Sequence, residues 1–154
     1  MTNAVGPAEH AARIAAARDR MLAFAAACPD SDWRSRPLSD QGDDRPVGVI
    51  ADHVAHAYAY IADWIRQILD GAELRLDATV VDRLNAEHAG MAGEVTQTTV
   101  ADHLRRSGDA IVTLVAALSV TELEAGGGRV GRLAEIAARH ADDHRSDIER
   151  ALLR

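Results

Sequence analysis

The stretch RLAEIAARHADDHRSDIERAL, residues 132–152, decides the fold class of this chain. Its apolar residues recur every three or four positions, which is the period of one face of an α-helix. The apolar arc that contains Leu133 and Ile148 also contains His140 and His144, about 40° apart at 100° per residue. Two imidazoles at this spacing lie about one helical turn apart, close enough to bind one metal ion.

A carboxylate is predicted on the same face. Asp147 lies about 20° from His140 by the same arithmetic, inside the apolar arc. An unpaired charge is costly to bury, so an inward aspartate is less expected than either histidine.

Four segments carry the pattern of long helices, and none shows the alternation typical of a strand. Proline or glycine residues follow most of these segments, and three consecutive glycines at 126–128 mark a break before the last one. We expect the long helices at about residues 8–27, 46–69, 99–118 and 130–153, and a shorter helix at about 80–91. The fold class predicted is all-α, a single-domain four-helix bundle over residues 1–154 with a short extra helix in the connection between the second and third long helices.

A third histidine lies at the centre of the apolar face of the second predicted helix. His53 falls between Ala57 and Trp64 on one side and Tyr60 on the other, whereas His56 lies at the edge of the face. Three inward histidines from two helices would give a facial set of nitrogen donors with open positions for water or substrate. The alternative from the residues alone is that each is a core histidine satisfied by a hydrogen bond.

The remaining candidates carry less signal. His10 is expected in solvent and His103 on the surface, and His88 could face inward from the short helix. Trp33 is expected to pack on the end of the bundle, with a place at the mouth of a site as the alternative. Cys28 has no basic neighbour in the sequence to lower its pKa, so we expect a buried and inert thiol.

Composition excludes several classes of function. The net charge is −7 with no basic tract, which argues against binding nucleic acid. No stretch reaches the roughly 18 apolar residues of a membrane span, and the first residues do not form a signal peptide. The single cysteine excludes an internal disulfide. We therefore expect a cytoplasmic protein that contacts neither membrane nor nucleic acid.

Four pieces of the sequence, in order along nearly the whole chain, resemble the DinB-like (DinB/YfiT) superfamily of metal-binding four-helix bundles. The combination of a histidine in the second helix with H-x-x-x-H near the end of the chain is the most specific part. The pieces are Trp33 with Arg36-Pro37, PVGVIADHVAHA at 46–57, DRLNAEHAG at 82–90 and RHADDHRSDIERAL at 139–152.

The resemblance implies that His53, His140 and His144 are the metal ligands. It implies a divalent ion, commonly zinc, nickel or iron, and a homodimer. Asp147 stands where many relatives have glutamine, which leaves its contacts with a substrate or with a ligand histidine undecided. Relatives include enzymes that use mycothiol, bacillithiol or glutathione in S-transfer or isomerisation.

Our leading hypothesis is a metal-dependent S-transferase or isomerase in which the ion lowers the pKa of a low-molecular-weight thiol, such as mycothiol, that attacks an electrophile. Asp147 or Tyr60 would orient a ligand proton or a histidine N–H. One alternative is a metal-dependent hydrolase that uses bound hydroxide. The other is a non-enzymatic interaction or stress-response bundle with structural metal or none.

Overall fold

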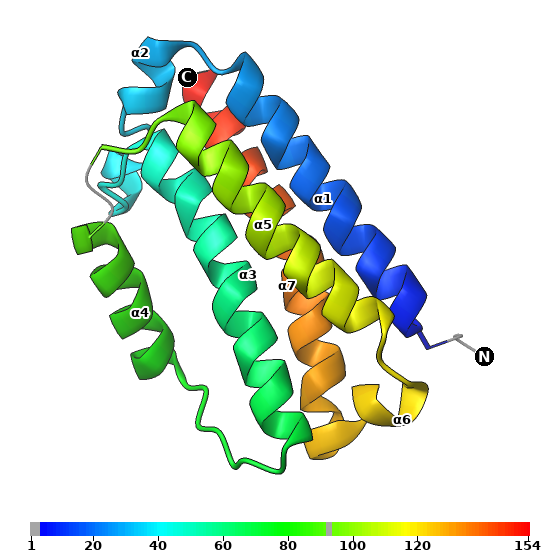
Figure 1. Cartoon of the computed structure of the whole chain (residues 1–154). Helices are drawn as coiled ribbons and strands as arrows, with labels where there is room; N and C mark the ends of the chain where they lie inside the picture. Colours follow the sequence, from blue (N-terminus) through cyan, green and yellow to red (C-terminus); the bar gives the residue numbers. More distant parts are fainter. Residues whose placement is uncertain (1–3, 92–93) are drawn as a thin grey trace.

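Four long helices form a bundle in the computed structural model, which describes residues 4–91 and 94–154 (Figure 1). No strand occurs in these residues, so the predicted all-α fold is confirmed. The long helices are α1 (Pro7–Ala27), α3 (Val47–Leu69), α5 (Gln97–Ala116) and α7 (Ala125–Leu152).

Each of α1 and α3 packs along both α5 and α7, so α1 and α3 lie diagonally across the bundle. One core of fully buried side chains fills the space between the four helices. It includes Ile14, Met21, Ile50, Ile65, Leu104, Ile111 and Ile148. The neighbouring placement of α3 and α7 is what brings the histidines of the two helices to one place.

Local sequence explains most of the helix ends. Thr96 caps α5, where its side chain accepts a hydrogen bond from the backbone N–H of Thr99. Gly71 follows α3 with a φ of 87°, a left-handed conformation that glycine adopts readily. The residue that precedes α3 is Pro46, and no side chain caps this helix with a hydrogen bond at that position. The predicted break at residues 126–128 is confirmed by left-handed φ values at all three glycines.

Four shorter elements connect the long helices. The predicted extra helix is α4 (Ala78–Met91), which lies beside α3 and outside the four-helix core (Figure 1). The sequence did not predict α2 (Asp30–Arg34), the 3₁₀ turn η1 (Ser39–Gln41) or α6 (Val120–Leu123). Elements of three to five residues are too short to show a helical period.

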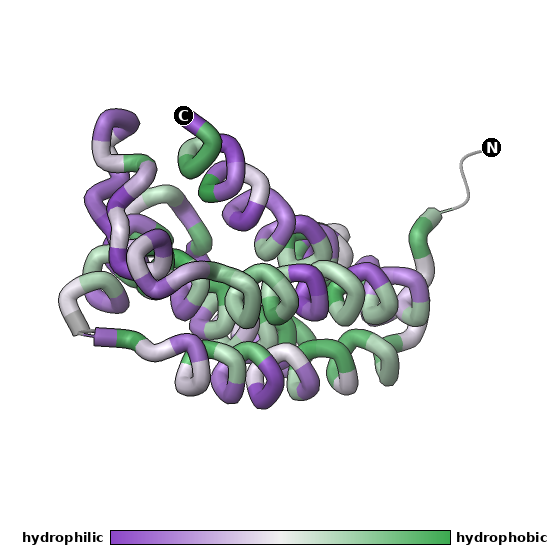
Figure 2. Tube along the Cα trace, turned by 90° about the horizontal axis from the view of Figure 1, so that it is seen from above, coloured by the Kyte–Doolittle hydropathy of each residue, from purple (hydrophilic) through white to green (hydrophobic). Residues whose placement is uncertain are grey.

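Figure 2 shows hydrophilic and hydrophobic residues alternating along the helices, as expected where one side of each faces a core. Within residues 4–91 and 94–154, no helix combines the length and the apolar character needed to cross a bilayer.

The close approach of α2 to α3 can be tested at Gly48. A Cβ atom there would lie 2.6 Å from Trp33 Nε1 and 2.9 Å from Val95 Cγ2. We expect Gly48→Ala to lower the free energy of unfolding in urea by about 1–3 kcal/mol, because the buried indole cannot move freely. Gly90→Ala is the control, since its Cβ would meet no heavy atom within 4 Å and should leave stability unchanged or higher. A Gly48→Ala protein as stable as the parent would contradict this packing.

Candidate metal centre

Three histidines converge between α3 and α7. One ring nitrogen from each of His53, His140 and His144 lies within 4.8 Å of the other two. His53 Nε2 and His140 Nε2 are 3.1 Å apart, and the ring centroids of the three pairs are separated by 4.5–5.1 Å. Nitrogen donors bound to one zinc ion at about 2.1 Å lie roughly 3–3.5 Å from one another. The triad is therefore close to the arrangement that one ion requires.

The surroundings of the triad are apolar. His53 is 3% exposed in the middle of α3, and Ile50 and Ala57 on the same helix are also buried. Ala141 and Ile148 of α7 are fully buried, while His140 and His144 are partly buried. Buried apolar side chains of both helices therefore adjoin the triad on its inner side.

Burial keeps the three imidazoles neutral. It lowers the pKa of His53 to about 2 and that of His140 to about 3, with a further contribution from the charges of neighbouring histidines. The pKa of His144 is lowered as well, first by burial and then by the positive charge of Arg45. Neutral imidazole is the form that binds metal, so the site is ready for an ion at neutral pH.

The hydrogen bonding does not fit three satisfied core histidines. His53 Nδ1 is buried and has no partner among the described residues. Its other ring nitrogen, Nε2, lies 3.1 Å from Nε2 of His140, and which of the two donates depends on where each neutral ring carries its proton. Buried ring nitrogens normally find a hydrogen-bond partner, and leaving one unpaired costs about 1–3 kcal/mol. Three neutral nitrogen donors on an apolar wall fit a divalent ion such as zinc, nickel or iron.

A second histidine network adjoins the triad. The carboxylate of Asp52 accepts hydrogen bonds from His88 Nε2 at 2.7 Å and from His103 Nδ1 at 2.8 Å. Burial alone would raise the pKa of Asp52, but the two hydrogen bonds outweigh burial and hold that pKa well below its usual range. The ring of His88 also stacks on His56 at 5.0 Å and lies 5.9 Å from the ring of His53. This network ties α4 and α5 to α3 beside the triad.

The sequence predicted only part of this network. His88 faces inward from α4, as expected, and is 8% exposed. The surface position expected for His103 is wrong, because its side chain is 30% exposed and bonded to Asp52. The sequence did contain one indication of this network, because Asp52 is a carboxylate directly before the inward-facing His53. His10 was expected in solvent, which is also wrong: it is buried in α1, 3.7 Å from a carboxylate oxygen of Glu135.

The inward orientation expected for Asp147 is wrong. Its side chain is 50% exposed and accepts a hydrogen bond from Arg150. The buried arc of α7 is centred nearer Ile148, which lies about 100° from Asp147 around the helix. Ile136, on the same edge as Asp147, is likewise exposed.

Tyr60 is half-buried, and its ring packs edge-on against His56 at 5.4 Å. Burial raises the pKa of Tyr60 to about 12, so its hydroxyl remains a donor at neutral pH. Cys28 is buried as expected, and burial followed by nearby carboxylates raises the pKa of its thiol. This cysteine is therefore not a nucleophile of the site.

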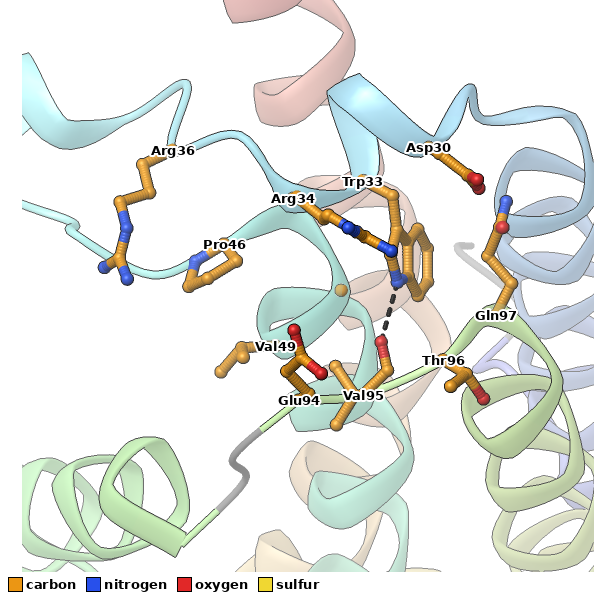
Figure 3. Close-up of a pocket in the computed structure, with 11 residues that line it drawn as sticks. Asp30, Trp33, Arg34, Arg36, Pro46, Val49, Glu94, Val95, Thr96 and Gln97 are labelled. Carbon is orange, nitrogen blue, oxygen red and sulfur yellow. Dashed lines mark hydrogen bonds between the residues drawn. The ribbon is translucent and has the colours of Figure 1, made fainter.

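Trp33 lies at the end of the bundle, as expected, and lines a cavity of about 430 Å³ there (Figure 3). Its indole N–H donates to the carbonyl of Val95 at 2.9 Å, which joins α2 to the segment before α5. The lining also includes Arg34, Arg36, Gly48 and Gln97, but none of the three histidines of the triad.

The buried neutral histidines predict a pH dependence of stability. Metal-free protein should lose stability as the pH falls below about 6.5, because the unfolded chain then binds protons that the folded triad does not. For each histidine that stays neutral, the free energy of unfolding should fall by up to about 1.4 kcal/mol per pH unit. The fall should continue until the pH reaches the folded pKa, which is about 3 for His140 and about 2 for His53. Urea unfolding of chelator-treated protein between pH 7 and pH 5 measures this.

The control is the variant in which His53, His140 and His144 are all replaced by leucine. Its stability should depend less steeply on pH over the same range, since these three groups no longer titrate. Equal slopes for the two proteins would show that the triad is not held neutral by the fold.

Comparison with known proteins agrees with the geometry. A family model described as the DinB superfamily matches residues 13–148, a range that contains all three histidines of the triad. No curated protein and no solved structure gives a significant match. The chain belongs to the DinB superfamily.

Proposed function

We propose that this protein is a metal-dependent enzyme that works with a low-molecular-weight thiol, as an S-transferase or an isomerase. The observation that carries the proposal is the convergence of three neutral imidazoles from α3 and α7, one buried and two partly buried. Three protein ligands leave room in the coordination sphere of an ion, as is typical of catalytic rather than structural sites. Membership in a metal-binding superfamily supports the same conclusion.

His53, His140 and His144 would hold zinc, nickel or iron through ring nitrogens. A divalent ion at this place would lower the pKa of a thiol ligand and so supply thiolate at neutral pH. The apolar side chains of α3 and α7 exclude water around the donors, which strengthens every electrostatic interaction in the site. Mycothiol is one candidate thiol, and the second substrate would be a small electrophile.

Two further residues are proposed to orient the reactants. Tyr60 keeps its proton at neutral pH and could donate it in a hydrogen bond to a ligand. The negative charge of Asp147 partly offsets the lowering of the His144 pKa. The exposed carboxylate of Asp147 could bind a substrate from the solvent side. We further propose that the protein acts as a homodimer.

Cobalt substitution gives a direct test of thiol binding, because a thiolate bound to cobalt(II) adds a charge-transfer absorption. Cobalt-loaded protein should develop this absorption when 2-mercaptoethanol is added, at a pH below the ordinary pKa of the thiol. Removing an outer-shell partner of a metal ligand typically lowers metal affinity by roughly 10- to 100-fold. The variant His140→Ala removes a ligand itself, so its affinity for cobalt should fall by more than this. It should give no thiol band while its helical circular dichroism is retained.

Cobalt binding without any response to thiol, at any pH, would contradict the thiol chemistry. A parallel screen of thiol conjugation and ester hydrolysis on the zinc-loaded protein then separates a transferase from a hydrolase. Activity in the hydrolysis arm alone would replace the proposed function with the hydrolase.

A further inference from the structure

The short helix α4 buries a histidine where a docking helix would be expected to bury an apolar residue. Among residues 78–90, His88 alone is buried, with 8% of its surface exposed. Val81 and Leu84 of the same helix are only partly buried. An apolar side chain would hold α4 on the bundle without needing a polar partner, so the histidine at this position needs an explanation.

Two contacts fix the ring of His88. Its Nε2 lies 2.7 Å from a carboxylate oxygen of Asp52, and the ring stacks on that of His56 with 5.0 Å between the centroids. An ionised carboxylate only accepts hydrogen bonds, so Nε2 of His88 carries the proton of the neutral ring. The other ring nitrogen, Nδ1, is therefore an acceptor.

This acceptor lies in a ring that neighbours a metal-site histidine. Nδ1 of His88 and Nδ1 of His53 are both buried and unpaired within the described part of the chain. The centroids of the two rings are 5.9 Å apart and their planes are inclined by 58°. Nε2 of His53 lies 3.1 Å from Nε2 of His140, so an ion between them would take Nε2 and leave the proton of His53 on Nδ1. His53 then carries a donor next to an unused acceptor.

A small adjustment is enough to join the two nitrogens. A direct hydrogen bond of about 2.9 Å allows two imidazole centroids to be up to roughly 5.2 Å apart, which is roughly 0.7 Å less than in this structure. Ion binding requires adjustments of similar size, because the donor nitrogens of the triad lie within 4.8 Å of one another and must approach to roughly 3–3.5 Å. Both Nδ1 atoms are shielded from solvent, so a protein group and not water must be the partner.

We propose that His88 is a positioning residue of the metal centre, whose Nδ1 accepts a hydrogen bond from Nδ1–H of His53 while Asp52 fixes His88 in the tautomer that can accept it. The chain from Asp52 through His88 holds the ring of His53 with Nε2 directed towards the ion. Metal-bound histidines normally donate their second N–H to such an acceptor. The inference rests on the metal site of the proposed function, but not on its thiol chemistry.

The test measures the affinity of the full chain for cobalt(II) by competition with a chromophoric chelator. His88→Leu keeps an apolar side chain on α4 and removes the acceptor, so it should bind cobalt about 10- to 100-fold more weakly than the parent. His88→Gln should recover part of this loss, because its amide can donate to Asp52 and accept from His53. Helical circular dichroism is measured for each protein. If His88→Leu does not fold, His88→Phe replaces it and should show the same loss.

The matched control is His103→Leu. His103 contributes the other hydrogen bond to the carboxylate of Asp52, at 2.8 Å, from α5. Among the described residues the ring of His88 contacts the ring of His53, whereas the ring of His103 contacts no ring of the triad. His103→Leu should therefore bind cobalt nearly as tightly as the parent does.

Unchanged cobalt affinity in His88→Leu would overturn the proposal. An equal loss in His103→Leu would also overturn it, because the effect would then come from Asp52 and not from His88. A His88→Gln protein no better than His88→Leu would show that the hydrogen bond is not what matters. A parent that binds cobalt without responding to thiol contradicts the thiol function alone, and the affinities of the variants still decide the role of His88. A parent that binds no cobalt would overturn both.

Discussion

The packing of α3 against α7 with three histidines at their interface is the constraint on which the site depends. Each ring occupies a position where a bundle would otherwise bury leucine, and desolvation keeps the rings neutral. Without an ion, His53 leaves a ring nitrogen unpaired and faces another imidazole 3.1 Å away. An ion between the rings would take one nitrogen of each ring as a ligand.

Polar residues around the triad form two separate arrangements. On one side, Asp52 joins His88 and His103 and holds α4 beside α3. On the other, Asp43 holds Arg45 at the start of α3 with one nitrogen left free. The polar residues near the triad therefore come from connecting segments as well as from the long helices.

Helical periodicity predicted the fold and the inward orientation of the three histidines, because both depend on which side of a helix a residue occupies. His53, His140 and His144 lie on apolar faces long enough to be recognised. Periodicity failed at Asp147, which is exposed, because the buried face of α7 is not centred on His140 as the pattern had indicated. It also could not predict partners far apart in the chain, such as Asp52 and His103, which are separated by 51 positions. The unpaired nitrogen of Arg45 is visible only when every neighbour has been placed.

The most direct test of this account is the metal content of the protein, purified without an affinity tag and measured by elemental analysis. The account predicts about one divalent ion per chain, lost on chelation together with stability, because the ion binds the three converging nitrogens of the folded chain and not the unfolded chain. The variant with leucine at positions 53, 140 and 144 should hold no metal and should not respond to chelator. A parent protein that is folded, metal-free and unable to gain stability from added zinc, nickel or iron would contradict the account.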